Sequence, residues 1–175
     1  MRKALIVIDM LNGFFVEGNP LYCGDEARKI IPFVKEKIEE FERNGELVVF
    51  LTDAHDSYDK EFGAFPPHCI AGTEEAQVID ELAEHAARHT VVPKKRYSGF
   101  HGTRLDEVLQ AARPEVVEVV GVCTNICVLF TVEDLRNRDY PVRVYAKGVA
   151  TFDREAHDFS LKQMESVLVA EVVRE

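Results

Sequence analysis

The sequence predicts an α/β protein: a single domain over residues 1–175, with three αβα layers and a six-stranded, mostly parallel sheet flanked by helices. Short β-branched runs alternate along the chain with longer segments of helical period. The first run, KALIVID, is continuously apolar, as expected for a strand buried on both faces. With 175 residues and 46% hydrophobic content, the chain can bury one sizeable core.

The first half of the chain is expected to hold three strands and two helices. The strands are 3–9, 46–53 and 90–94, and the helices are about 25–44 and 74–87. IIPFVKEKIEEF in the first helix carries apolar residues three and four apart, which is the spacing of a helix with one buried face. Pro32 marks an early turn or the true helix start, and Gly45 is a C-terminal stop.

The second half continues the alternation without an internal repeat or linker. Strands are expected at 115–122, 141–147 and 166–173, and helices near 104–112, 126–138 and 154–165. Thr103 and Asp106 have the spacing of a capping box at the start of one helix.

Charge and cysteine content limit the partners and the compartment. Lys and Arg number 21 against 31 Asp and Glu, so the net charge of -10 repels nucleic acid and anionic membranes. No window approaches the roughly 18 apolar residues of a membrane span, and the N-terminal apolar run meets Asp9 too soon for a secretory signal. Four unevenly spaced cysteines favour reduced thiols in a cytoplasm over a disulfide scaffold.

Reactive side chains follow four consecutive predicted strands. They are Asp9; Asp53 with His55; Lys94 and Lys95; and Cys123 with Cys127. Each alone could be a solvated loop residue. Because ligands bind outside the carboxyl ends of strands in open α/β sheets, the four groups together predict a site at this edge.

Two thiols lie in GVCTNICVLFT, where Cys127 is near a helix start that should lower its pKa. Their C-x-x-x-C spacing is not the C-x-x-C of redox pairs, and a structural zinc site would need further ligands. Two buried inert thiols remain possible at this point. A nucleophile would need a base, which Asp9 could provide if Lys94 kept it ionised, and N–H groups of the turn 123–127 could receive an oxyanion. That arrangement indicates acyl transfer from an amide through a thioester.

A second cluster lies in residues 52–69. Asp53 and His55 are two apart in an extended segment and share a side, and Glu61 and His68 follow. Imidazole with carboxylate suits zinc, iron or manganese. The alternative is a polar loop with incidental histidines.

Four segments in order resemble the isochorismatase-like cysteine hydrolases, and within that superfamily they are most similar to nicotinamidases. The segments are ALIVIDMLNGFF, TDAHD with FPPHCIAGT, KKRYSGFHGT and GVCTNICVLFTVEDL. The resemblance covers essentially the whole chain. It implies the isochorismatase-like fold and hydrolysis of a linear amide C–N bond, converting nicotinamide to nicotinate and ammonia in NAD salvage.

The resemblance also implies a role for each matching position. The catalytic residues would be Asp9, Lys94 and Cys127, with Lys95 as an alternative lysine. One divalent metal ion per chain, zinc foremost with iron or manganese as alternatives, would be bound by Asp53, His55 and His68, with Glu61 as in some members. The substrate would contact Phe14, Phe65 and Tyr97, and the N–H groups of Cys123 and Cys127, beside a cis peptide, would form the oxyanion hole. A small-molecule amide substrate and a homo-oligomer, dimer or tetramer, are implied as well.

Three positions depart from the family pattern, and the first two put the substrate in question. Gly13 replaces an acidic residue, Asn125 replaces an aspartate, and Phe65 stands where many relatives have tryptophan. Hydrolysis of another small amide, ureide or carbamoyl compound, or of isochorismate, is therefore the alternative, and a non-catalytic binding module or a Cys123–Cys127 redox pair is a weaker one. Structural or surface positions are expected for the remaining residues of these types: Cys23, Cys69, His85, His89, His101 and His157.

Overall fold

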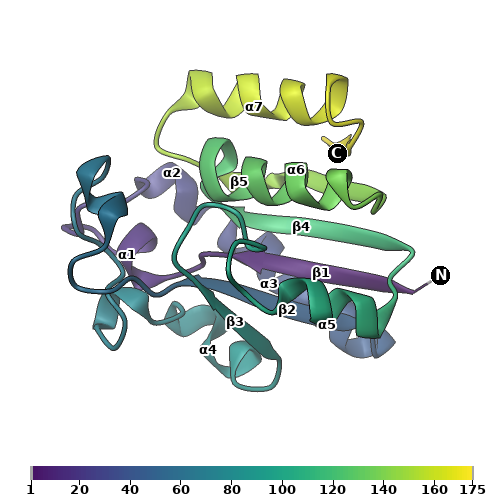
Figure 1. The fold of residues 1–175 in the computed structure, drawn as a ribbon, viewed down its shortest axis with the longest axis horizontal. Coiled ribbons are helices and arrows are strands. Elements are labelled where there is room, and N and C mark those ends of the chain that lie inside the picture. Colours follow the sequence, from purple (N-terminus) through teal and green to yellow (C-terminus); the bar gives the residue numbers. More distant parts are fainter. Residues whose placement is uncertain (1, 175) are drawn as a thin grey trace.

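A computed structural model describes residues 2–174, and its centre is one sheet of six parallel strands (Figure 1). The strands are β1 (Lys3–Ile8), β2 (Leu47–Asp53), β3 (Thr90–Lys94), β4 (Val116–Val122), β5 (Val142–Ala150) and β6 (Glu171–Val173). Their order is β3-β2-β1-β4-β5-β6, so β1 and β4 are central. The predicted fold class is confirmed, and every pairing is parallel.

Helices cover both faces of the sheet. They are α1 (Asn12–Phe15), α2 (Asp25–Arg28), α3 (Ile31–Asn44), α4 (Asp80–Ala86), α5 (Leu105–Ala112), α6 (Leu129–Asn137) and α7 (Arg154–Ser166). In Figure 1, α5 and α6 lie in front of the strands and α3 lies behind them. No helix within residues 2–174 has the length and apolar character to cross a membrane.

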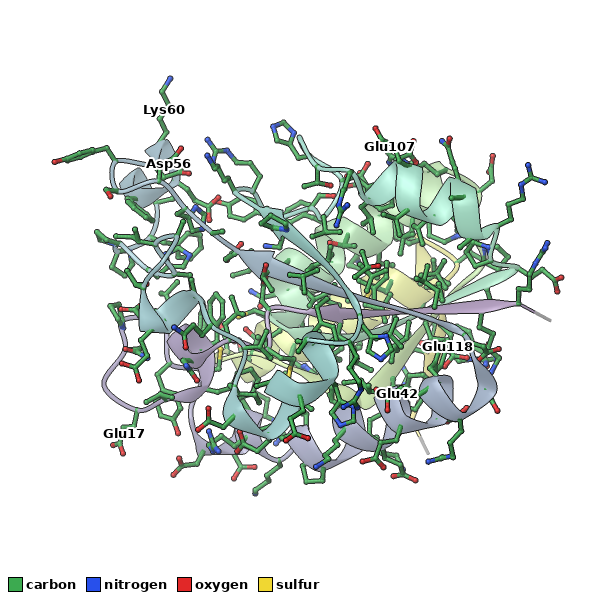
Figure 2. All side chains as sticks on the ribbon, turned by 90° about the horizontal axis from the view of Figure 1, so that it is seen from below. Glu17, Glu42, Asp56, Lys60, Glu107 and Glu118 are labelled. Carbon is green, nitrogen blue, oxygen red and sulfur yellow. The ribbon has the colours of Figure 1, made fainter. Side chains whose placement is uncertain are left out.

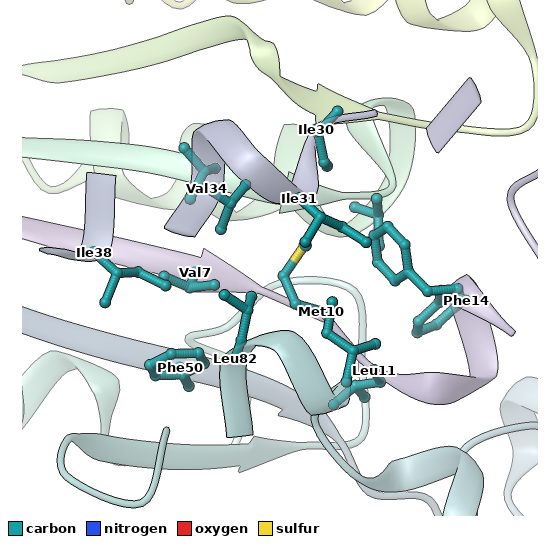
Figure 3. Packing of buried hydrophobic residues seen from close by; sticks show 14 of the residues in the cluster. Val7, Met10, Leu11, Phe14, Ile30, Ile31, Val34, Ile38, Phe50 and Leu82 are labelled. Atoms are coloured by element: carbon teal, nitrogen blue, oxygen red, sulfur yellow. The ribbon is translucent and has the colours of Figure 1, made fainter. Parts of the chain in front are cut away.

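Strand β1 is buried on both sides, as its apolar sequence predicts. Leu5 and Val7 pack in the core beneath α3 and α4, whereas Ala4, Ile6 and Ile8 pack in the core beneath α5, α6 and α7. Figure 3 shows the first of these cores, where Val7 lies among side chains that include Ile38 of α3 and Leu82 of α4. These two cores fix the central strands, and with them the strand ends that carry the reactive residues.

Three predicted elements differ most in extent from the structure, and smaller differences include the strand expected at 141–147, which is Val142–Ala150. The first helix is split into α2 and α3, with Pro32 in the first turn of α3 and Gly45 in a left-handed conformation after its end. The second shortens to α4, preceded by the 3₁₀ turn Glu74–Ala76. The last strand begins only at Glu171, because the N–H groups of Val167 and Leu168 both donate to the Gln163 carbonyl and end α7 in a turn.

The capping box predicted at Thr103 is wrong in part. The Thr103 hydroxyl does accept a hydrogen bond from the Leu105 N–H at 3.1 Å. The Asp106 carboxylate, however, contacts Gln110 and Arg138. The turn before α5 therefore uses one of the two side chains of the motif.

Glu118 of β4 is the most deeply buried acidic group away from the strand ends. Its carboxylate is completely buried and lies 3.1 Å from Lys3, 3.1 Å from Lys37 and 3.2 Å from Arg143. Burial opposes its ionisation, but the hydrogen bond from Tyr145 and the neighbouring ammonium groups outweigh burial and lower the pKa of Glu118. Figure 2 shows the contrast with Glu17, Asp56, Lys60 and Glu107, which lie at the periphery.

Gly121, near the carboxyl end of β4, is required by the close approach of β1. Its φ is +119°, and an added Cβ would lie 2.0 Å from the Ile8 carbonyl oxygen. We expect Gly121→Ala to lower the free energy of unfolding by about 3 kcal/mol or more, because neither backbone can move aside. Urea unfolding followed by circular dichroism measures the loss. Gly63→Ala is the matched control, since a Cβ there meets no atom within 4 Å; equal stability of the two variants would contradict the expectation.

Candidate active site

Asp9, Lys94 and Cys127 come together at the carboxyl edge of the sheet. The Lys94 ammonium lies 2.9 Å from an Asp9 carboxylate oxygen and 3.3 Å from the Cys127 sulfur. It also lies 2.5 Å from a carboxylate oxygen of Asp53. Asp9 is fully buried, and Lys94 and Cys127 are 2% and 7% exposed, so the group is shielded from bulk water. A base, a cation and a thiol therefore meet in a low-dielectric setting.

The ladder between β2 and β3 decides which lysine enters this group. Lys94 is in register with Asp53, and its side chain points into the site. Lys95 follows on the other side of the strand, is exposed and pairs with Asp56 at 2.7 Å. Of the two lysines left open by the sequence, Lys94 is the one in contact with Asp9 and Cys127.

Asp9 adopts a backbone conformation that turns its carboxylate toward the site. Its φ is +50°, in the left-handed region that Asp and Asn tolerate better than most residues. Its N–H donates to the Leu51 carbonyl at 2.9 Å, and its carboxylate accepts the Asp53 N–H at 2.9 Å. The side chain is thus held from the end of β2 as well as from β1.

Burial sets the protonation states of the three groups. Burial and the Asp53 carboxylate raise the pKa of Asp9 to about 6. Burial opposes the charge on Lys94, but the carboxylates of Asp53 and Asp9 outweigh it and raise the pKa of Lys94. The prediction that the helix start lowers the pKa of Cys127 is wrong, because burial raises that pKa and outweighs the Lys94 charge. At neutral pH the arrangement is a thiol beside a carboxylate and an ammonium.

The turn that carries Cys123 and Cys127 is a π-helical turn, Thr124–Val128, that leads into α6. The expected cis peptide is present, between Val122 and Cys123. The Cys123 carbonyl accepts the N–H groups of Ile126 and Val128, on either side of Cys127. The turn therefore departs from regular α-helical hydrogen bonding where the thiol projects.

Two side chains that the sequence did not single out as site residues hold this turn from outside. His157 of α7, expected at a surface or helix position, has its Nδ1 2.9 Å from the Thr124 hydroxyl. Thr151, after β5, donates to the Asn125 side-chain oxygen at 2.7 Å. Nothing in the local sequence marks either residue, because both contacts join segments more than 25 residues apart.

Asp53, His55 and His68 place one potential ligand atom each within 4.8 Å of one another. Nε2 of His55 and Nε2 of His68 are each 3.7 Å from the same Asp53 oxygen. These separations are too long for hydrogen bonds but suit ligands around a common ion with bonds of about 2.0–2.2 Å. The Lys94 ammonium holds the other Asp53 oxygen.

The surroundings of the histidines fit a metal ion. Nδ1 of His55 is 3.2 Å from an Asp59 carboxylate oxygen, and Nδ1 of His68 is 2.8 Å from the Pro66 carbonyl oxygen, so both Nε2 atoms can act as ligands. Among the described residues, Nε2 of His55 and Oε2 of Glu61 are buried without a hydrogen-bond partner. Oε1 of Glu61 is 3.8 Å from His55 Nε2. A bound cation would give these buried, unpaired polar atoms the partner that buried polar groups normally have.

An apolar pocket opens onto both groups. Its lining includes Asp53, Glu61 and His68 on one side and Cys123 and Cys127 on the other. The remaining lining residues are Phe14, Leu21, Phe65, Tyr97, Ile126 and Phe152. The three aromatic residues predicted to contact substrate therefore all line the pocket. No lysine or arginine is among the lining residues that the structure describes.

Gly13, one of the three departures, has a packing role. A Cβ at Gly13 would lie 2.6 Å from the Cys69 sulfur and 3.3 Å from the Glu75 carbonyl oxygen. Cys69 is fully buried, as expected of a structural residue. The acidic side chain that the resemblance leads one to expect at this position would therefore collide with Cys69 unless Cys69 moved.

Comparison with known proteins gives one consistent result. The isochorismatase domain model matches residues 3–174. A nicotinamidase, PncA from Bacillus subtilis, is 35% identical, with a TM-score of 0.94 over 99% of this chain and 100% of that one. N-carbamoylsarcosine amidase from Thermoplasma acidophilum is 34% identical, with a TM-score of 0.88 over 99% and 96%. Pyrazinamidase of Pyrococcus horikoshii, solved in complex with zinc, is 28% identical, with a TM-score of 0.85 over all of both chains. The chain belongs to the isochorismatase family of hydrolases.

Proposed function

We propose that this protein is a cysteine amidohydrolase that converts nicotinamide to nicotinate and ammonia. The observation that carries the proposal is the contact of Lys94 with Asp9, Asp53 and Cys127 at one end of an aromatic pocket. That contact joins a nucleophile, its base and the candidate metal ligands in one buried network. Similarity to a nicotinamidase over the full chain agrees with this reaction.

Cys127 attacks the carboxamide carbon, and its proton passes to Asp9. The Lys94 ammonium stabilises the negative charge that develops on sulfur and oxygen, and N–H groups of Cys123 and Cys127 receive the oxyanion. Collapse of the tetrahedral intermediate expels ammonia with the proton held by Asp9. Water then attacks the thioester as Asp9 takes its proton; the C–S bond breaks, the carboxylic acid is released, and the proton on Asp9 returns to the Cys127 sulfur. A buried thiol beside an ionised carboxylate suits proton transfer during the attack, because a free thiolate is not the resting form.

Asp53, His55 and His68, with Glu61, would hold one divalent ion, zinc foremost and iron or manganese as alternatives. When bound, the ion supplies a Lewis acid that can hold a ring nitrogen of a heteroaromatic substrate. The protein's own part is to position these ligands through Asp59 and Pro66 and to line the ring's site with Phe14, Phe65 and Tyr97. By resemblance, the reaction would serve NAD salvage in the cytoplasm, in a homo-oligomer.

The pocket lining favours an uncharged aromatic amide over a carbamoyl amino acid. An N-carbamoyl amino acid carries a carboxylate, which calls for a cationic partner when it is desolvated. Apart from the proposed metal ion, the described lining provides no lysine or arginine for such a carboxylate, but it has three aromatic rings besides Phe152. Hydrolysis of a carbamoyl compound remains the second candidate, because the N-carbamoylsarcosine amidase is similar over nearly the full length.

Ammonia release from nicotinamide tests the substrate. We expect equimolar ammonia and nicotinate when the protein is assayed with zinc, iron or manganese supplied separately. N-carbamoylsarcosine serves as the competing substrate in the same assay. Turnover of the carbamoyl compound with no ammonia from nicotinamide under any of the metals would refute the substrate and leave the reaction class in place.

Metal binding has a test that needs no activity. We expect His55→Ala to weaken zinc binding on the order of a hundredfold or more, because a direct ligand matters at least as much as the outer residues that orient it. Isothermal titration of the chelator-treated protein with zinc chloride measures the affinity. His101→Ala is the matched control, since His101 is exposed and outside the ligand group. If the two variants bound zinc with equal affinity, the proposed metal site would be refuted.

A further inference from the structure

Cys23 and Cys123 form a sulfur contact that the proposed mechanism does not use. They are 100 residues apart in sequence, yet their sulfur atoms lie 3.5 Å apart. Both thiols are free and buried. The sequence raised Cys123 with Cys127 as a redox pair, but the sulfur that touches Cys123 is that of Cys23, while the Cys127 sulfur contacts Lys94.

The two cysteines separate two openings at the surface. Cys123 lines the substrate pocket. Cys23 lines a neighbouring depression together with Gly24, Thr151 and His157. Cys23 is 5% exposed and Cys123 is 4% exposed, so a small oxidant can reach the two thiols from either opening.

We propose that Cys23 and Cys123 form a reversible disulfide, and that this bond is a modification site beside the nucleophile. Bond formation needs the sulfurs to approach from 3.5 Å to about 2.05 Å, a shift of about 1.5 Å. A peroxide is the oxidant by chemical class. One thiolate attacks a peroxide oxygen and becomes a sulfenic acid as the O–O bond breaks; the second thiol attacks that sulfur and releases water. In sum, two thiols lose two hydrogens with their electrons, and one hydrogen peroxide becomes two waters.

The bond would connect the pocket wall to the turn of the nucleophile. The Cys23 N–H donates to the Phe14 carbonyl at 2.9 Å, and the Cys23 sulfur lies 3.6 Å from the Leu21 carbonyl oxygen. Phe14 and Leu21 both line the pocket. Drawing Cys123 toward Cys23 would shift a backbone N–H assigned to the oxyanion, so amide hydrolysis should fall on oxidation and return on reduction.

Peptide mapping by mass spectrometry tests the bond without reference to activity. The experiment uses the variant Cys127→Ala, or Cys127→Ser if alanine impairs folding, because the substitution removes Cys127 as a competing thiol. This variant is treated with hydrogen peroxide. We expect a linked peptide pair containing Cys23 and Cys123 that is lighter by two hydrogens and separates with dithiothreitol. Cys69→Ala is the control and should show the same pair, because the Cys69 sulfur contacts the Glu75 carbonyl and not another thiol. Absence of the linked pair in both variants, with either cysteine found as sulfinic acid or unmodified, would overturn the proposal.

The activity measurement rests on the proposed function, and the mass measurement does not. Wild type and Cys23→Ser are each compared with their own untreated activity after peroxide and again after dithiothreitol. We expect wild type to lose on the order of a hundredfold reversibly, as for one displaced oxyanion donor, and Cys23→Ser to lose clearly less. If wild type and Cys23→Ser lost activity equally and reversibly, the inactivation would be due to oxidation of Cys127. The disulfide would then have no effect on turnover.

Discussion

Cys127→Ala is expected to reduce amide hydrolysis on the order of 10⁴-fold or more, to the limit of detection. In the proposed mechanism the Cys127 sulfur forms the thioester, and the described pocket offers no second thiol in contact with Lys94. Alanine removes one buried sulfur and keeps the backbone N–H groups of the turn. The rate of ammonia release at saturating nicotinamide measures the loss.

Cys23→Ala is the matched control for this substitution. It also removes a buried thiol, yet its sulfur contacts Cys123 and not Lys94. We expect it to retain most of the activity under reducing conditions. Ammonia release that survives in Cys127→Ala at a rate near that of wild type could not proceed through a thioester on Cys127, and another group or water would have to attack the amide directly.

Asp9→Asn is expected to lower the turnover rate by about 10²–10⁴-fold with a much smaller change in KM. Asparagine tolerates the left-handed backbone of this position, and its amide oxygen can still accept the Asp53 N–H. It cannot take the proton of Cys127. Because the shape is preserved and the proton acceptor is lost, the effect should fall on the chemical step. Steady-state kinetics, together with urea unfolding of the same preparation, separates this effect from misfolding.

Asp106→Asn provides the same chemical change at a distant, partly exposed site, where the carboxylate pairs with Arg138. It should leave both kinetic constants near those of wild type. If Asp9→Asn kept its turnover rate while KM rose, Asp9 would be a binding residue, and another group would have to accept the thiol proton.

Local sequence patterns were sufficient to predict the strands, the layers and most of the residues that lie at the carboxyl edge of the sheet. The apolar run of β1 and the alternation of runs with helical segments are set by side chains that are neighbours in sequence. Because parallel strands end on one side of a sheet, Asp9, Asp53, Lys94 and Cys127 could be expected together before any contact was known. The structure places them in contact. The roles of these residues stay predictions that the variants above test.

Protonation states were not available from the sequence. The position of Cys127 at a helix start predicts a lowered pKa, but burial, together with the nearby carboxylates, raises that pKa instead. The last strand begins later than predicted, because contacts outside its own segment decide where it starts. SVLVAEVV has the apolar content of a strand, but hydrogen bonds to Gln163 turn its first residues back.

The sequence by itself determined the fold class, the family and the residues that can do chemistry, because strand period, turn residues and motif order are local. The tertiary structure alone decided that Lys94 and not Lys95 contacts Asp9 and Cys127, that Thr151 and His157 hold the turn of Cys127, and that Cys123 contacts Cys23. Each of these depends on strand register or on contacts between segments far apart in the chain. No short window of sequence contains both partners of such a contact, so the contact can be identified only once packing has brought the two segments together.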